Sequence, residues 1–396
     1  MHVPESYQFF CPVKVNSGSK ALEQLPSELG ALGVERPLIL GRRDALRRGA
    51  LGTIITAFKE SGMAVGLLDA VPADFDVTVV RQLANVYRSK RHDAVIAVGG
   101  GSIIDAAKVL NLCVSEDVED VTPYTREGVL KTRLNPFVFV PTMTGTGYET
   151  SKYAWMKNLT LSSHFLMPDL VVIDPRMVRG GATVEGAALA MAALGGAADV
   201  CTCRVKNPLA DTYAYAAIQY VSENMAGAMG RARDTMSRMA IVNAAVMAGC
   251  ALSNVPPGPV RRLGTIAGDM FRIPDGICMG LLLPYILDYY TVHHGYFIAD
   301  LLLPLAGFEE YACTAHGLRA QRAINRVYRI QHELFHITGG AIPRTLKEAQ
   351  VPRYMLQDIA ERAVMQGVPD IGYDECLTLL THAWDGSPVA FDEKRG

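Results

Sequence analysis

The chain has 396 residues, and its 38 Lys and Arg against 40 Asp and Glu give a formal net charge of −2. That length suffices for two ordinary domains, and no basic stripe indicates a nucleic-acid partner. The eight cysteines form no C-x-x-C pair typical of a zinc ribbon, no secretion signal opens the sequence, and no apolar run approaches the roughly 20 residues that span a bilayer. We therefore expect a cytoplasmic protein with reduced cysteines and with neither a nucleic-acid nor a membrane partner.

Short apolar runs alternate with segments of helical length through the first 175 residues. The runs predict five strands, at 37–40 (PLIL), 64–68 (AVGLL), 94–98 (AVIAV), 137–140 (FVFV) and 170–173 (LVVI). Segments 51–61 and 78–89 between them read as helices. Alternating strands and helices predict a mainly parallel sheet, and continuous apolar strands indicate that helices cover both of its faces.

Beyond about residue 180, long segments rich in alanine and methionine replace the strands. Helices are predicted at 183–194, 208–229, 233–252 and 319–336. The predicted fold class is an α/β domain at 1–178 followed by an all-α domain at 179–396, with the change of pattern near Asp174-Pro175. We expect the active site in the cleft between the two domains.

A glycine triplet follows the strand predicted at 94–98. Residues 93–108 read DAVIAVGGGSIIDAAK, in which Gly99, Gly100, Gly101 and Ser102 join a strand directly to a helix. Glycines let backbone N–H groups approach a ligand closely, and a helix start offers unpaired N–H donors to a phosphate. Ser102 is expected to cap the helix or to contact a phosphate. The alternative is a tight turn that binds nothing, but the strand–turn–helix context favours a phosphate site.

A second loop, PTMTGTGYE at 141–149, follows the strand predicted at 137–140. It offers the hydroxyl groups of Thr142, Thr144 and Thr146 together with two glycines. Hydroxyls at the end of a parallel strand suit a ribose, a pyrophosphate or an amide. Two such loops in one sheet predict a dinucleotide site.

These two loops resemble the cofactor-loop signatures of the iron-containing alcohol dehydrogenases. The segments YQFFCPVKV from Tyr7, NPLADTYAYAAI from Asn207 and IPDGICMGLLLPYIL from Ile273 also resemble that family, in the expected order. Dehydroquinate synthase and glycerol-phosphate dehydrogenases share the fold, but their signatures fit less well. The resemblance implies a Rossmann-like dinucleotide domain, a helical domain, and hydride transfer between NAD(P) and a small alcohol or carbonyl compound. It also places Asp105 among the cofactor-binding residues and suggests a homodimer.

The family binds its metal with one aspartate and three histidines, and this sequence departs from that pattern. The resemblance places the aspartate at Asp199, but the histidine positions fall on Cys203, Arg261 and Asp275. The nine histidines leave none between His164 and His293. We therefore expect no metal of the family type.

Three interpretations of these positions remain open. In the first, Arg261 supplies the positive charge, is held by Asp199 and Asp275, and polarises the substrate carbonyl. In the second, Asp199, Cys203 and Asp275 bind a different metal such as zinc, although the arginine would repel a cation. In the third, the site is a relic and the chain is a non-catalytic, nucleotide-binding homologue with a partner-binding role. Taken singly, Cys203 is also consistent with a small buried hydrophobe and Arg261 with a surface salt bridge.

The strand predicted at 37–40 leads into Gly41-Arg42-Arg43-Asp44. The family usually places an aspartate where Arg42 stands, to hold the adenosine ribose. An arginine there accommodates a 2′-phosphate, so NADP is expected in preference to NAD, with Arg42 as the main candidate contact to that phosphate and Arg43 as a second one. The alternative is two exposed loop arginines. His293 and His294, and the His332 and His336 pair, are interpreted as surface side chains.

Overall fold

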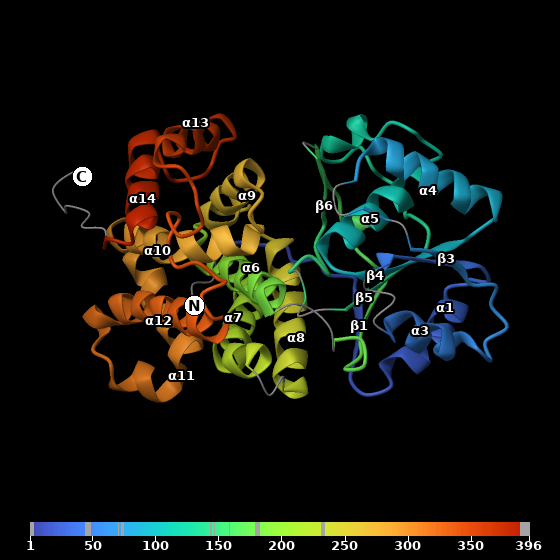
Figure 1. Cartoon of the computed structure of the whole chain (residues 1–396), viewed down its shortest axis with the longest axis horizontal. Helices are drawn as coiled ribbons and strands as arrows, with labels where there is room; N and C mark the ends of the chain where they lie inside the picture. Colours follow the sequence, from blue (N-terminus) through green and yellow to red (C-terminus); the bar gives the residue numbers. More distant parts are fainter. Residues whose placement is uncertain are drawn as a thin grey trace. The chain divides into compact units, whose positions relative to one another are not determined.

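The computed structural model (Figure 1) describes residues 4–43, 49–69, 71–72, 75–142, 145, 147–157, 159–178, 183–230 and 234–388. The chain divides into two compact units. One is Phe10–Gly181, and the other combines Met1–Phe9 with Ala182–Gly396. The first carries a parallel sheet and the second is helical, which confirms the predicted fold class. The division differs from the predicted boundaries in that residues before Phe10 group with the helical unit.

The first unit is built on a six-stranded sheet. Its strands are β1 (Lys14–Ser17), β2 (Pro37–Gly41), β3 (Gly66–Leu68), β4 (Ala94–Gly99), β5 (Phe137–Pro141) and β8 (Leu170–Ile173). They lie in the order β1-β8-β5-β4-β2-β3, and every neighbouring pair is parallel. All residues of β2, β4, β5 and β8 are buried, as expected for a sheet covered on both faces.

Helices cover the two faces of this sheet. The unit's helices are η1 (Ala21–Gln24), α1 (Leu25–Ala31), α3 (Leu51–Phe58), α4 (Val77–Ser89), α5 (Gly101–Ser115), η3 (Thr122–Thr125) and η4 (His164–Leu166). Figure 1 shows α1 and α3 on one face and α4 and α5 on the other. Residues of α1 and α3 share one hydrophobic cluster with Ile39, Ile96 and Val138 of the sheet. All five strands predicted from apolar runs are present.

Three strands of this unit were missed. Strand β1 reads KVNS and is largely exposed at the sheet edge, so it gives no apolar run. The antiparallel hairpin of β6 (Tyr153–Met156) and β7 (Leu159–Ser162) lies apart from the main sheet. Both of its strands are only four residues long, too short for a clear periodicity.

The second unit consists of helices packed around one hydrophobic core. They are α6 (Thr183–Thr202), α7 (Pro208–Met229), α8 (Thr235–Leu252), α9 (Pro259–Phe271), α10 (Asp275–Asp300), α11 (Leu302–Cys313), α12 (His316–Ile337), η5 (Arg353–Met355), α13 (Leu356–Met365) and α14 (Tyr373–Asp385). The four helices predicted from the sequence correspond to α6, α7, α8 and α12. Side-chain caps explain some of their starts: Asn207 accepts the N–H of Ala210 in α7, and Asp234 accepts the N–H groups of Met236 and Ser237 in α8.

The first described residues pack on the helical unit. The side-chain amide of Asn207 donates to the backbone oxygen of Gln8 at 2.8 Å, and Phe9 stacks on Tyr213 with ring centroids 5.6 Å apart. The next residue belongs to the sheet unit: Phe10 meets His164 edge to face at 4.8 Å. Adjacent residues of the chain are therefore anchored in different units.

Two helices, Val184–Thr202 and Thr235–Leu252, are long and apolar enough to cross a membrane by length and composition. In this structure 78% and 61% of those segments are buried inside the protein. A helix that is apolar all round is also typical of a globular core, and here both helices contribute to the core of the helical unit.

Candidate cofactor site and candidate catalytic site

The two glycine-containing loops leave neighbouring strands at the same edge of the sheet. Because all six strands are parallel, their carboxyl ends share one edge. Strands β4 and β5 are adjacent, with Gly99 opposite Pro141. The backbone N–H of Thr142 donates to the oxygen of Gly99 at 3.1 Å. The structure therefore brings the two predicted loops together at their bases, at the carboxyl ends of the strands, where open α/β sheets bind ligands.

The first turn of α5 has the features of a phosphate cradle. Gly100 is its N-cap residue, and no side chain caps the helix. A Cβ atom at Gly100 would lie in open space, whereas one at Gly99 would meet Ile103 at 2.7 Å. Gly99 therefore permits close packing of strand and helix, and Gly100 leaves room beside the N–H donors. The expectation that Ser102 caps the helix is wrong, because Ser102 is the second residue of α5 and Gly100 takes the cap position.

The other predicted cofactor residues occupy varied environments. Arg42 follows β2 directly and is half-buried, while Thr142 and Asp105 are buried at 7% and 8% exposure. Arg43 donates to Asp69 at 3.2 Å, so a carboxylate already holds the second loop arginine. Thr144 and Thr146 lie outside the described residues, as does Asp44.

A buried polar stripe on α5 was missed as a whole, although Asp105 was among the predicted cofactor residues. Asp105, Lys108 and Asn111 recur every three residues on a helix whose other residues from Ile103 to Cys113 are apolar and buried. Lys108 is 0% exposed, and Asn111 is 2% exposed. The signal was present in the motif itself, since a regular polar spacing within an apolar helix requires buried partners.

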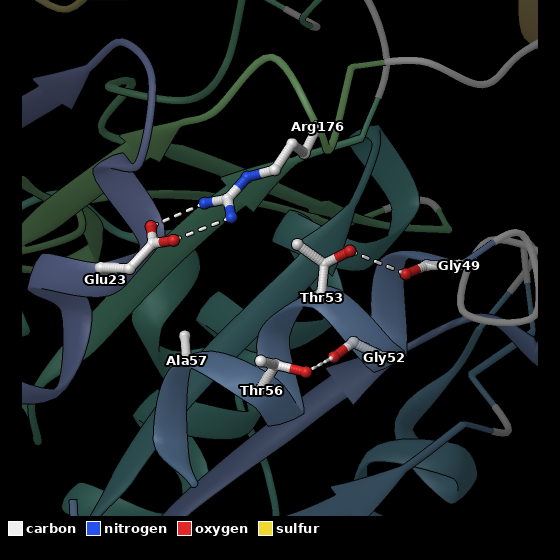
Figure 2. A pocket seen from close by; sticks show the side chains of 7 residues that line it. All are labelled: Glu23, Gly49, Gly52, Thr53, Thr56, Ala57 and Arg176. Carbon is white, nitrogen blue, oxygen red and sulfur yellow. Dashed lines mark hydrogen bonds and ion pairs between the residues drawn. The ribbon is translucent and has the colours of Figure 1, made fainter. Parts of the chain in front are cut away.

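A pocket of about 440 Å³ lies at the same edge of the sheet (Figure 2). It lies beside η1 and α3, which follow β1 and β2, and Arg176, which follows β8. The guanidinium of Arg176 donates to both carboxylate oxygens of Glu23, at 2.8 and 2.6 Å, and to Asp174. Figure 2 shows that pair opposite Thr53 and Thr56 of α3. None of the predicted cofactor residues that the structure describes lines this pocket.

The candidate catalytic residues lie in the helical unit, around α9. Asp199 of α6 is 2% exposed, and its carboxylate accepts the backbone N–H groups of Val260 at 3.0 Å and Arg261 at 2.8 Å. These are first-turn donors of α9, so Asp199 ties the start of that helix to α6. A Cβ atom at Gly258 would lie 2.4 Å from the Asp199 carboxyl carbon. Only glycine at this position allows so close an approach.

Arg261 is buried at 5% exposure, which excludes the surface salt bridge that the sequence left open. Its positive charge lowers the pKa of both Asp199 and Asp275. Burial is the larger effect for both groups and raises the pKa of Asp199 to about 7 and that of Asp275 to about 6. The three residues thus interact electrostatically, and the Asp199 carboxylate also accepts hydrogen bonds from the backbone of α9.

Asp275 is fixed from the opposite end of the cluster. It is the first residue of α10, and its carboxylate accepts the hydroxyl proton of Thr265 at 3.0 Å. A Cβ atom at Gly268 would lie 2.4 Å from an Asp275 oxygen. Arg261, Thr265 and Gly268 are spaced four and three residues apart and share one face of α9. Thr265 and Gly268 were missed because their role depends on this contact between two helices.

The chemistry of these side chains does not fit the metal of the family. A guanidinium has no lone pair to donate, and its charge repels a cation. Cys203 is half-buried, and burial followed by the nearby charge of Asp199 raises the pKa of its thiol, which disfavours the thiolate that zinc requires. Within the part of the chain that the structure describes, no three His, Cys, Asp or Glu side chains are grouped to hold a metal ion. We derive no catalytic step through a metal.

The histidines considered in the sequence stay apart from this cluster where they can be placed. His332 and His336 are exposed on α12, in agreement with a solvated helix face. The side chains of His293 and His294 lie outside the described residues.

Comparisons with known proteins agree with this arrangement of two units. The iron-containing alcohol dehydrogenase family matches residues 12–175, and its C-terminal domain family matches residues 187–376. Long-chain-alcohol dehydrogenase 1 of Geobacillus thermodenitrificans is 25% identical over 88% of this chain and 88% of its own length. The 1,3-propanediol dehydrogenase of Citrobacter freundii is 25% identical over 88% of this chain and 90% of its own length. The crystal structure of a 1,3-propanediol oxidoreductase superposes with a TM-score of 0.89 at 22% identity, over 96% of this chain and 100% of that one. The chain therefore belongs to the iron-containing alcohol dehydrogenase family.

Proposed function

We propose that the protein is an alcohol dehydrogenase or carbonyl reductase that prefers NADP(H) and works without the metal of its family. The observation that carries this proposal is the position of Arg261. A permanently charged guanidinium is buried on α9 at 5% exposure. Burial raises the pKa of Asp199 and of Asp275, and the charge of Arg261 partly offsets that rise at both of these former metal-ligand positions.

The cofactor would occupy the carboxyl edge of the sheet. The first turn of α5 offers its N–H groups to the pyrophosphate, beside the open space at Gly100. Arg42 at the end of β2 would contact the 2′-phosphate. When bound, NADPH would supply a hydride to the carbonyl carbon and become NADP⁺, and solvent would supply the proton that completes the alcohol.

The side chains around α9 would act on the substrate oxygen. Negative charge develops on that oxygen as the carbonyl is reduced, and a guanidinium held in a buried site stabilises it without reorganising solvent. Asp199 and Thr265 act indirectly: Asp199 fixes the start of α9, and Thr265 holds Asp275. The two aspartates keep the arginine in place by balancing its charge.

The 1,3-propanediol dehydrogenase named above acts on a small diol, which supports a small alcohol and its aldehyde or ketone as the proposed substrate pair. The charges of Arg261 and the two aspartates favour a polar substrate. We also propose a homodimer located in the cytoplasm.

Chelation tests metal independence. The purified protein is assayed for NADPH oxidation with a panel of aldehydes, ketones and oxo acids, before and after dialysis against EDTA. We expect turnover of at least one compound, an unchanged rate after dialysis, and no stoichiometric iron or zinc by elemental analysis. Loss of a stoichiometric metal together with activity would contradict the proposal. NADPH binding without any turnover would favour a non-catalytic homologue.

The cofactor preference predicts an effect of Arg42→Asp. Charge-assisted hydrogen bonds to the 2′-phosphate should make NADPH bind more tightly than NADH by about 1 to 3 kcal/mol. The aspartate should remove that difference or reverse it, because it repels the phosphate and accepts the ribose hydroxyls. Titration of both dinucleotides measures the change, with Arg43→Asp as the matched control, since Arg43 already pairs with Asp69. Equal wild-type affinities would rule out the assigned role of Arg42.

A further inference from the structure

We propose that Lys108 is a positioning residue for the dinucleotide site, an inference that rests on the proposed function. Its ammonium group holds the 147–153 segment, which continues from the second predicted cofactor loop, against the helix that begins at the first. The affinity of the protein for either dinucleotide would then depend on a side chain that touches neither the cofactor nor the substrate.

Three acceptors of the ammonium group lie on one segment. Nζ of Lys108 donates to the backbone oxygens of Ser151 at 2.7 Å, Tyr153 at 2.8 Å and Tyr148 at 3.3 Å. Three carbonyl acceptors match the three N–H donors of an ammonium group. Nζ of Lys108 also lies 3.4 Å from the hydroxyl oxygen of Ser151. Lys108 therefore holds the backbone at three points, Tyr148, Ser151 and Tyr153.

Burial makes these bonds strong and hard to replace. Lys108, Glu149, Thr150 and Ser151 are all 0% exposed. A buried ammonium group that loses its acceptors carries a large desolvation cost. Separating the segment from α5 would therefore cost much free energy.

Helix α5 is the element that connects this segment to the phosphate cradle. Lys108 lies two turns after Gly101, where α5 begins beside the open space at Gly100. At the other end of the second loop, Thr142 donates its backbone N–H to Gly99. The second loop is thus tied to the first at its start through Thr142, and Lys108 holds it at its end, through Tyr148, and just beyond. A dinucleotide that contacts both loops requires them in a fixed relation.

Asn111 provides a matched control on the same stripe. Its side-chain amide donates to the backbone oxygen of Asn135 at 2.8 Å, just before β5, and it is 2% exposed. It therefore ties α5 to the entry of β5, whereas Lys108 ties the helix to the segment beyond the exit. Asn111→Leu should cost stability in the same region without releasing the 147–153 segment.

Trp155 supplies a spectroscopic signal for the segment. It lies on β6, with its ring 4.6 Å from that of Tyr148. The chain has two tryptophans, and the other, Trp384, lies on α14. In a Trp384→Phe background, emission at 295 nm excitation reports on Trp155 alone. We expect Lys108→Met to shift this emission in the folded protein, and Asn111→Leu to leave it unchanged.

The decisive experiment is dinucleotide titration of the full chain in that background. Lys108→Met should raise the Kd of NADPH and that of NADH by the same factor, at least tenfold, because the lysine does not distinguish the 2′-phosphate. Asn111→Leu should change neither Kd by more than about twofold at a similar loss of urea midpoint. If Lys108→Met leaves both affinities and the Trp155 emission as in Asn111→Leu, the lysine is structural only and the inference fails.

A measurement on the wild type decides the matter if Lys108→Met does not fold. Hydrogen–deuterium exchange with and without NADPH should show protection of the 147–153 segment together with the first turn of α5. Protection of α5 alone would overturn the inference. A wild type that binds neither dinucleotide overturns the proposed function instead, and the titration shows this before any variant is compared.

Discussion

Gly100→Val should reduce the affinity for NADPH at least about 100-fold, equivalent to ~2.7 kcal/mol, while the protein stays folded. The new side chain would occupy the open space beside the first turn of α5, where the pyrophosphate is expected. Loss of two charge-assisted hydrogen bonds is enough to account for that effect. Fold retention is expected because Gly100 has φ −119° and ψ −155°, an extended conformation that valine adopts readily.

Fluorescence titration of NADPH measures the affinity, and far-ultraviolet circular dichroism measures the fold. Gly317→Val is the matched control, since a Cβ there also enters open space but lies on α12 of the helical unit. The control should bind as the wild type does. If a folded Gly100→Val variant binds NADPH normally, the phosphate site is elsewhere.

Arg261→Ala should lower kcat about 100- to 1,000-fold, the effect of losing one oxyanion-stabilising donor, and change the Kd of NADPH less than about threefold. The guanidinium is remote in sequence from the dinucleotide loops and belongs to the helical unit. The expected split between turnover and cofactor affinity distinguishes loss of a group on the substrate oxygen from loss of the cofactor site.

Two further variants serve as controls for Arg261→Ala. Arg262→Ala removes the neighbouring arginine, whose guanidinium donates to the backbone oxygens of Gln366 and Gly367, and should leave kcat nearly unchanged. Arg261→Lys keeps the charge that balances Asp199 and Asp275, and therefore guards against unfolding of the alanine variant. It should retain part of the activity, because a lysine supplies charge without the planar fork. Unchanged kcat in a folded Arg261→Ala variant would remove Arg261 from catalysis.

Hydrophobic pattern alone predicted the architecture because the central strands are buried on both faces. The runs at β2, β4, β5 and β8 are apolar at almost every position, a pattern typical of a parallel sheet that is covered on both faces. Strand β1 was not predicted because an edge strand with exposed residues carries no such pattern. Helices α9 and α10 were not predicted, because α9 follows a proline- and glycine-rich stretch and α10 contains Pro284.

The candidate site residues also differ in how far they could be predicted from the sequence. Local motifs identified Gly99 and Gly100, since a strand that runs into glycines and a helix is a short-range signal. Contacts between distant segments could not be read in the same way. Asp199 is retained where the family has a metal ligand, but its bonds to the start of α9 join residues about 60 positions apart. The three carbonyls around Lys108 are likewise set by the path of a loop that carries no apolar periodicity.

The anchoring of Phe9 and Phe10 in different units has a consequence for dissecting the protein. The chain passes from one unit to the other twice, once between these two residues and once between Gly181 and Ala182. A single cut at the second crossing would leave the first nine residues attached to the sheet unit while Phe9 still stacks on Tyr213. The two products would still be held together by the contacts of the first nine residues with the helical unit. One cleavage therefore does not separate the two units. The sheet unit in isolation has to begin at Phe10.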